Sequence, residues 1–343
     1  MLRTRPILRR PARARWLGAG LVASLLAAAL LAAGAVGAAA SLSLSAGAES
    51  SGGEVQVNAF APRTLTVTAG ESVTWRIDST EFHTIHFLGG SPPPPFIAAS
   101  PDGVFLNPAA TAPSGGTSYD GSGLAGSGLL TKGQTYSLSF PTPGSYDYVC
   151  LVHPEMKGTV VVKAAGETTD SQAVVDARRT AEVNAHLAGR GIPLLMTNLG
   201  ELPAEGVSAG IAAGTGDHVV MVPRFLPQRV TVKAGDAVTW VWKDPETPHT
   251  VTFLGGEQPP DVVIPRPQAD GPPKLELNPA VLTPSGDPTS YSGGHLNSGF
   301  LDPAQSPAGS GAPTFSVRFD QPGTYEYVCL LHEGMGGTIV VES

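Results

Sequence analysis

The amino-acid sequence repeats itself over most of its length, and this repeat limits the fold more than any other feature. Residues 54–163 and residues 218–342 match in order. The longest shared run is YSLSFPTPGSYDYVCLVHPEMKGTVVV at 136–162, which corresponds to FSVRFDQPGTYEYVCLLHEGMGGTIVV at 315–341. Self-similarity of this length indicates a duplicated domain, with each copy long enough to bury its own core. We therefore expect a first domain at 54–163 and a second at 218–342.

Within each copy the sequence favours a β-sandwich. Val73 and Trp75 alternate with polar neighbours, and Trp240 lies in the matching run of the second copy, which is typical of half-buried strands. The 42 Gly and 32 Pro residues supply tight turns between short strands. Two stretches rich in Pro, Gly and Ser, 91–128 and 257–312, are expected to be long ordered loops inserted in the sandwiches. The predicted fold class is all-β, with two tandem sandwiches.

The segment between the copies, residues 164–217, differs in kind from both. Asp170 can cap a helix over roughly 171–188, and Gly189 with Pro193 would end that helix. The apolar residues of this stretch are moderately amphipathic, so the helix is expected to pack against one or both domains. We predict a partly helical linker.

The N-terminal segment, residues 1–48, has the composition of an export signal or a membrane anchor. Residues 16–40 carry no charge and directly follow a cluster of six arginines. A basic segment before an apolar one is typical of a secretory signal peptide. The apolar stretch is also long enough to span a bilayer, so an uncleaved N-terminal anchor helix is the alternative. In both cases the chain from about residue 50 onward is exported, and is either periplasmic or on the extracellular face of the membrane. The six arginines are Arg3, Arg5, Arg9, Arg10, Arg13 and Arg15.

The charge of the remaining chain argues against nucleic acid as a partner. The formal net charge is −8, and without the six N-terminal arginines it becomes −8 − 6 = −14. Nucleic-acid-binding domains present a basic patch to the phosphate backbone, so a chain with this acidic net charge is a poor candidate for nucleic-acid binding. It would also be repelled by an anionic membrane surface.

Both cysteines of the chain occupy the same motif, Cys-x-x-His-x-x-Met, and in each copy a histidine in a strand-like His-Thr context precedes it. One thiolate, two imidazoles and one thioether form a soft ligand set that suits copper cycling between Cu(I) and Cu(II). Zinc favours a closed tetrahedral set, and iron–sulfur clusters need more cysteines. A disulfide between the two cysteines would leave the matching histidines and methionines unexplained. The predicted metal ligands are His83, Cys150, His153 and Met156 in the first copy, and His249, Cys329, His332 and Met335 in the second.

The first copy resembles the plastocyanin-like cupredoxins, and the amicyanin-like ones above all, through HTIHF at 83–87 and the run around its cysteine. The resemblance extends over about 110 residues in each copy. The resemblance implies an eight-stranded Greek-key sandwich, a type 1 (blue) copper and electron transfer between redox donor and acceptor proteins. Thr84 and Thr250 stand where such proteins often have Asn, so the hydrogen bond that supports the ligand loop is expected to differ. The resemblance implies that an apolar patch on the ligand loop serves as the electron port, and the alternative for these residues is ordinary packing beneath the loop. The candidate residues are Leu151, Val152, Pro154, Leu330 and Leu331.

Two other functions are weighed against an electron carrier. Multicopper oxidases and copper nitrite reductases also pair such domains, but they build a second centre from His-x-His pairs and from a histidine next to the cysteine. This sequence has neither, so we predict a protein that is not an enzyme. Copper storage or delivery would favour Met- and His-rich runs, which are absent from the sequence. The histidines left over, all interpreted as non-ligating, are His86, His186, His218 and His295.

Overall fold

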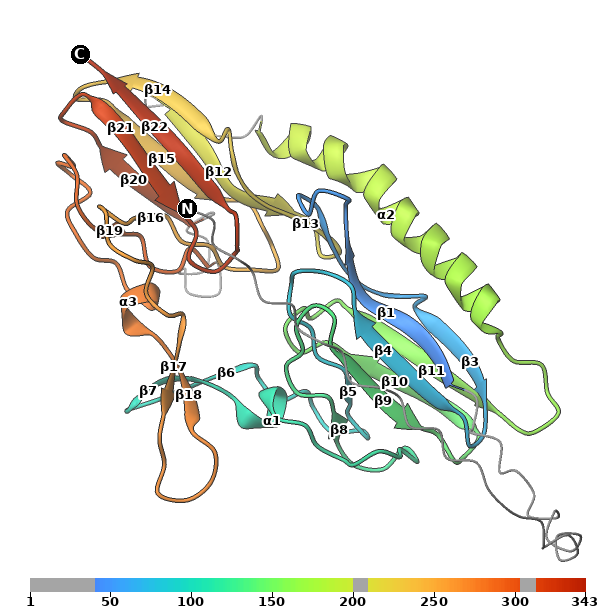
Figure 1. The fold of residues 1–343 in the computed structure, drawn as a ribbon. Helices are drawn as coiled ribbons and strands as arrows, with labels where there is room; N and C mark the ends of the chain where they lie inside the picture. Colours follow the sequence, from blue (N-terminus) through green and yellow to red (C-terminus); the bar gives the residue numbers. More distant parts are fainter. Residues whose placement is uncertain (1–40, 200–208, 303–312) are drawn as a thin grey trace, which may run out of the picture. The chain divides into compact units, whose positions relative to one another are not determined.

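The computed structural model describes residues 41–199, 209–302 and 313–343 (Figure 1). The apolar leader predicted at residues 16–40 lies outside these ranges. In the described part of the chain, no helix combines the length and the apolar character needed to cross a membrane.

The strands of the first copy are β1 (Ser41–Glu49), β2 (Gln56–Ala61), β3 (Thr64–Thr68), β4 (Ser72–Ile77), β5 (His86–Phe87), β8 (Ala125–Gly126), β9 (Thr135–Ser139), β10 (Gly144–Val149) and β11 (Lys157–Lys163). They form one sheet in the order β2-β1-β4-β9 and a second in the order β3-β11-β10-β5-β8. In β4, the side chains of Val73, Trp75 and Ile77 are buried and alternate with more exposed ones, as the sequence pattern predicts.

The strands of the second copy are β12 (Ala209–Gly216), β13 (Val220–Leu226), β14 (Arg229–Lys233), β15 (Ala237–Trp242), β16 (Thr252–Phe253), β19 (Leu296–Asn297), β20 (Thr314–Arg318), β21 (Gly323–Val328) and β22 (Gly336–Glu342). They repeat the same arrangement, with sheets β20-β15-β12-β13 and β14-β22-β21-β16-β19. Strand β13 also pairs with β2, which joins two of the four sheets into one eight-stranded sheet. The prediction of two tandem β-sandwiches is confirmed.

Each sandwich has its own aromatic core. The ring of Trp75 meets the edge of Tyr148 at a centroid distance of 5.2 Å, and Phe60 meets Tyr148 at 4.6 Å. Trp240 and Tyr327 repeat the first contact at 5.0 Å. Edge-to-face pairs of this kind add about 0.5–1.5 kcal/mol beyond the burial of their area. Because each tyrosine lies two residues before a cysteine, these cores fix the strand ends from which the cysteines project.

The Pro-, Gly- and Ser-rich inserts contain more regular structure than the long loops expected from the sequence. They form hairpins β6 (Ile97–Ser100) with β7 (Gly103–Leu106) and β17 (Val263–Arg266) with β18 (Lys274–Leu277), and the one-turn helices α1 (Pro108–Thr111) and α3 (Pro279–Leu282). The hairpins join in the order β17-β18-β7-β6. A lone two-stranded hairpin is marginal in water, and the pairing of β18 with β7 supplies the neighbour that each one needs.

The linker forms helix α2 (Gln172–Leu199), which is longer than the sequence predicts. The helix does not end at Gly189 or Pro193, and that expectation was wrong. A glycine costs about 1 kcal/mol and a proline about 3 kcal/mol in a helix interior, which a 28-residue helix can absorb when it packs on a surface. The Gln172 side chain exchanges hydrogen bonds of 2.9 and 3.0 Å with the backbone of Ser43, and α2 contacts strands of both copies.

Candidate metal centres

A short loop between β10 and β11 carries three of the predicted ligands of the first copy. Its ends are held together because the backbone N–H of Cys150 donates to the carbonyl of Met156 at 2.9 Å. Within the loop the N–H of Met156 donates to the carbonyl of His153 at 3.0 Å. The loop between β21 and β22 repeats both bonds, at 2.9 and 3.2 Å. The backbone therefore fixes the loop conformation in each copy independently of any metal.

The upstream histidine of each copy lies in an isolated β-bridge beside the second sheet. The N–H of His83 donates to the carbonyl of Leu130 at 3.1 Å, and the N–H of Leu130 donates back at 2.9 Å. His249 and Leu301 make the same pair of bonds at 3.2 and 2.8 Å. These two bonds hold each histidine backbone at the end of the sandwich where the ligand loop lies.

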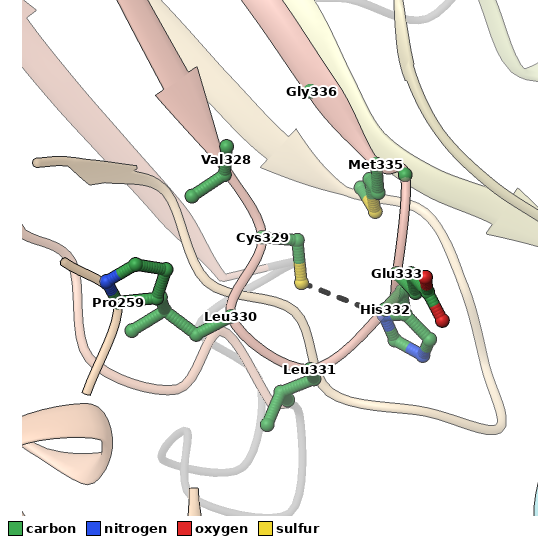
Figure 2. A pocket seen from close by; sticks show the side chains of 10 residues that line it. Pro259, Val328, Cys329, Leu330, Leu331, His332, Glu333, Met335 and Gly336 are labelled. Carbon is green, nitrogen blue, oxygen red and sulfur yellow. Dashed lines mark hydrogen bonds between the residues drawn. The ribbon is translucent and has the colours of Figure 1, made fainter. Parts of the chain in front are cut away.

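In both copies the cysteine and the two histidines gather into one buried group. The Cys150 sulfur lies 4.0 Å from His83 Nδ1 and 3.7 Å from His153 Nδ1. The matching distances from the Cys329 sulfur are 3.9 Å to His249 Nδ1 and 3.4 Å to His332 Nδ1, and Figure 2 shows the latter contact. A metal bound about 2.3 Å from sulfur and about 2.0 Å from nitrogen, at angles near 120°, separates these atoms by roughly 3.8 Å. The donor atoms therefore fit a single metal ion in each copy.

The two motif methionines lie at the far end of each ligand loop from the cysteine. Met156 and Met335 are both buried, with 1% of their surface exposed. In the second copy Met335 follows His332 and Glu333 along the loop, as Figure 2 shows. A thioether at this position of the loop would supply the weak axial ligand of a blue-copper site.

The threonine after each upstream histidine supports the thiolate and the loop. The backbone N–H of Thr84 donates to the Cys150 sulfur at 3.4 Å, and its hydroxyl oxygen accepts from the N–H of Leu151 at 2.8 Å. Thr250 makes the corresponding bonds at 3.4 and 2.8 Å. The hydrogen bond that the sequence left in doubt is therefore present, and a threonine hydroxyl makes it in place of an asparagine amide.

Replacing Thr84 by valine should destabilise the first domain while keeping the shape of the side chain. The partly buried N–H of Leu151 would lose its acceptor, and an unsatisfied donor kept from water costs about 1–3 kcal/mol. Denaturant unfolding of the purified protein measures this loss. Thr74→Val is the matched control, because the Thr74 hydroxyl bonds to Ser137 on an exposed face, where substitutions change stability by about 0.5 kcal/mol or less. Equal effects of the two substitutions would contradict the role given to Thr84.

Burial sets the protonation of the first group. It lowers the pKa of His83 well below its usual value and the pKa of His153 to about 4, so both rings are neutral near pH 7. Burial also raises the pKa of the Cys150 thiol. Neutral imidazoles are the form that binds a metal, and the thiol would lose its proton when the metal binds.

The second group has a different electrostatic balance. Burial alone would lower the pKa of His249, but hydrogen bonds to Asp244 and to the Cys329 sulfur raise it to about 9. Burial likewise acts to raise the pKa of Cys329, and the rings of His332 and His249 bring it well below the usual value. The second group therefore favours a thiolate beside a protonated ring before metal binding, which the first does not.

The motif analysis missed residues that hold the outer nitrogen of each upstream histidine. Ser79 and Asp244 contact the Nε2 atoms of His83 and His249, respectively.

Two glycines also lie against these rings. A Cβ atom built on Gly47 would be 2.2 Å from His83 Nε2, and one built on Gly214 would be 2.0 Å from His249 Nε2. Each glycine lies at an irregularity of β1 or β12 and has a positive φ. The shared Ala-Gly pairs at 46–47 and 213–214 were a weak signal for them.

The other histidines lie away from the two groups. His86, on β5, has a buried ring that packs against Gly126, and Thr252 takes its place in the second copy. His218 lies 2.5 Å from a carboxylate oxygen of Glu246, and His295 lies 3.7 Å from one of Glu257. His186 lies in α2. Within residues 41–199, 209–302 and 313–343, the groups of three potential ligands among Cys, His, Asp and Glu are the two described above.

A pocket of about 460 Å³ opens beside the second group (Figure 2). The ligand loop lines most of it, together with Pro259, and Leu330 and Leu331 give it an apolar rim. Leu151 and Val152 are half-buried on the loop of the first copy, and Pro154 is exposed. The residues predicted to form the port are therefore part of the ligand loops themselves, and those of the second copy line the pocket.

A β-sandwich that gathers a thiolate, two imidazoles and a buried methionine at one end has the architecture of the cupredoxins. Comparison with known proteins agrees. Residues 48–163 match the model of the copper binding proteins of the plastocyanin/azurin family. Amicyanin-alpha of Methylorubrum extorquens is 32% identical over 133 residues, which are 36% of this chain and 88% of that protein. Amicyanin of Paracoccus denitrificans is 32% identical over 99 residues, 29% of this chain and 54% of that protein. The chain belongs to the plastocyanin/azurin family of copper-binding proteins.

Solved structures of amicyanin variants are also similar to this chain. A methionine-to-alanine variant in the Cu(I) state shares 23% sequence identity, with a TM-score of 0.23 and coverage of 36% of this chain and 82% of that one. A proline-to-phenylalanine variant in the reduced state shares 29%, with a TM-score of 0.20 and coverage of 29% and 70%.

Proposed function

We propose that this protein transfers electrons outside the cytoplasm and binds one type 1 copper in each of two domains, 54–163 and 218–342. The observation that carries the proposal is the repeated buried group of one cysteine and two histidines, in which the cysteine and one histidine lie on a loop that backbone hydrogen bonds fix. The proposed ligands are His83, Cys150, His153 and Met156, and His249, Cys329, His332 and Met335.

In each domain the bound copper supplies one-electron chemistry between Cu(I) and Cu(II). The protein contributes the rest. The two Nδ1 atoms and the sulfur are aimed at one point, and the ligand side chains are buried, so water has little access. The Thr84 and Thr250 bonds tie the loop to the histidine strand. A pocket fixed in this way changes little between oxidation states, which keeps the barrier to electron exchange low.

The loop surface of the second domain suits contact with a redox partner protein. Leu330 and Leu331 are half-buried and border the pocket, while His332 is 8% exposed. An apolar rim around a slightly exposed ligand allows a partner to approach the metal without opening the site. We propose donor and acceptor proteins as the partners, and the N-terminal arginines with the apolar residues 16–40 support export or anchoring.

Reversible redox cycling separates an electron carrier from a copper store. The copper-loaded protein should be blue when oxidised, lose its colour with ascorbate and regain it with ferricyanide through repeated cycles. Buried ligands should also hold Cu(I) against a chelator such as bathocuproine for the duration of the cycles. Visible absorbance and copper content measured after each cycle test this. Colourless protein that gives its Cu(I) rapidly to the chelator would instead identify storage or delivery.

A further inference from the structure

The two candidate centres differ in the group that holds the outer nitrogen of the upstream histidine. In the first domain His83 Nε2 lies 2.8 Å from the hydroxyl oxygen of Ser79. In the second, His249 Nε2 lies 3.3 Å from a carboxylate oxygen of Asp244. All four side chains are 0% exposed. One ligand ring therefore faces a neutral hydroxyl, and the other faces a buried carboxylate.

Asp244 is built into the second site by further hydrogen bonds. Its Oδ1 accepts from the backbone N–H of Glu246 at 3.0 Å and from that of Thr247 at 3.4 Å. Its Oδ2, the atom facing His249, also accepts from the Thr247 hydroxyl at 3.0 Å. Burying a charged carboxylate costs several kcal/mol unless such donors stabilise it. These donors fix the orientation of the carboxylate and hold its Oδ2 against the His249 ring.

A carboxylate in this position favours the more oxidised metal. A ligand histidine that donates its outer N–H to a carboxylate becomes a more basic ligand. A buried negative charge also attracts Cu(II) more strongly than Cu(I), because the attraction grows with the charge of the ion. The Ser79 hydroxyl in the first domain carries no net charge. This difference lowers the reduction potential of the second centre relative to the first.

A smaller difference on the sulfur side acts in the same direction. The Thr84 hydroxyl lies 3.9 Å from the Cys150 sulfur, within range of a weak hydrogen bond. In the second domain the Thr250 hydroxyl lies 3.2 Å from the hydroxyl of Thr252, and within the described part of the chain it makes no such contact with the Cys329 sulfur. Hydrogen bonding around the cysteine sulfur tunes the potential of a blue-copper site. A donor to the sulfur withdraws charge from the thiolate, which raises the potential of the first centre.

We propose that Asp244 is a positioning residue that makes the second copper centre the lower-potential member of the pair. A single electron on the protein would then rest on the first centre at equilibrium. This inference rests on the proposed function, because it assumes two type 1 centres. Loss of the outer partner of a ligand histidine typically changes metal affinity about 10- to 100-fold. A tenfold preference for Cu(II) over Cu(I) corresponds to ~59 mV for one electron, so we expect the reduction potentials of the two centres to differ by at least that amount.

Single-site variants of the full chain measure the two potentials separately. Cys329→Ser leaves the first centre and Cys150→Ser leaves the second, and spectroelectrochemical titration of the blue absorbance gives each potential. The second centre should be reduced at the lower potential. Asp244→Asn keeps the size of the side chain and removes its charge. Added to Cys150→Ser, it should raise the reduction potential of the second centre by ~59 mV or more, which is a tenfold change in the preference for Cu(I) over Cu(II). Ser79→Asp added to Cys329→Ser should lower the reduction potential of the first centre.

The control variant is Thr247→Val, which removes one hydrogen bond to Asp244 and leaves its charge in place. It should move the potential much less than Asp244→Asn does. If Asp244→Asn does not fold, the two parent variants and Ser79→Asp still decide the question. The inference would be overturned if the two centres had equal reduction potentials, or if the first centre had the lower one. It would also be overturned if Asp244→Asn left the reduction potential of the second centre unchanged. Absence of type 1 absorbance from both parents would overturn the proposed function instead.

Discussion

Cys150→Ser should remove one blue centre and leave the other, halving the visible absorbance of the copper-loaded protein. The intense colour of a type 1 site comes from charge transfer between thiolate and copper, and a serine hydroxyl provides no thiolate. The two cysteines lie in separate sandwiches with separate cores, so loss of one site should not unfold the other domain. Visible absorption spectra at matched protein concentration, with copper content measured in parallel, give the result.

The matched control for this substitution is the second copy itself. Cys329→Ser should halve the absorbance in the same way, and the double variant should be colourless. Complete loss of colour in either single variant would contradict two independent centres. So would an unchanged spectrum in either of them.

Gly47→Ala should abolish the first centre although Gly47 is not a ligand. Its φ of +74° favours glycine, and a Cβ there would be 2.2 Å from the Nε2 atom of His83. The ring would have to move, and with it the Nδ1 atom that faces Cys150. We expect the copper content to fall from two equivalents to one, with loss of half the blue absorbance.

Gly53→Ala is the matched control, because it isolates the backbone strain from the steric contact. Gly53 has a φ of +72°, and a Cβ there would meet no heavy atom within 4 Å. Both substitutions cost about 1–2 kcal/mol for the left-handed backbone. Only Gly47→Ala should change copper content. Retention of both coppers in Gly47→Ala, or an equal loss in Gly53→Ala, would show that the contact with His83 does not shape the site.

The residues of the two candidate metal groups could be selected from the sequence because they repeat. A lone Cys-x-x-His-x-x-Met is moderate evidence, but the same four residue types in the same order in both copies leave little room for coincidence. The structure gathers Cys150 with His83 and His153, and Cys329 with His249 and His332. Alternation around Val73 and Trp75 likewise predicted the sandwiches, since strand periodicity is a local property of the chain.

The residues around the ligands could not be predicted, because they depend on tertiary pairing. Gly47 and Gly214 lie on β1 and β12, which precede the recognisable repeat at 54 and 218. Their contact with the histidines depends on a strand irregularity that no local pattern specifies. Ser79 and Asp244 are different residue types, so a search for shared residues passes over both of them. This difference, a hydroxyl in one copy and a carboxylate in the other, is the basis of the different reduction potentials that we propose for the two sites.

The structure of the inserts and of the linker could not be predicted from the sequence for the same reason. Their hairpins depend on the pairing of β18 with β7, between segments far apart in the sequence. The continuation of α2 past Gly189 and Pro193 is likewise opposed by local propensity. As a whole α2 contacts strands of both copies, and the sequence alone does not reveal which strands will be neighbours.

Copper stoichiometry combined with electron paramagnetic resonance of the oxidised protein tests the central claim most directly. Two equivalents of copper per chain, both with the narrow hyperfine splitting of type 1 sites, are the predicted result. One equivalent, no type 1 signal, or an additional type 2 signal of the kind found in copper oxidases would contradict it.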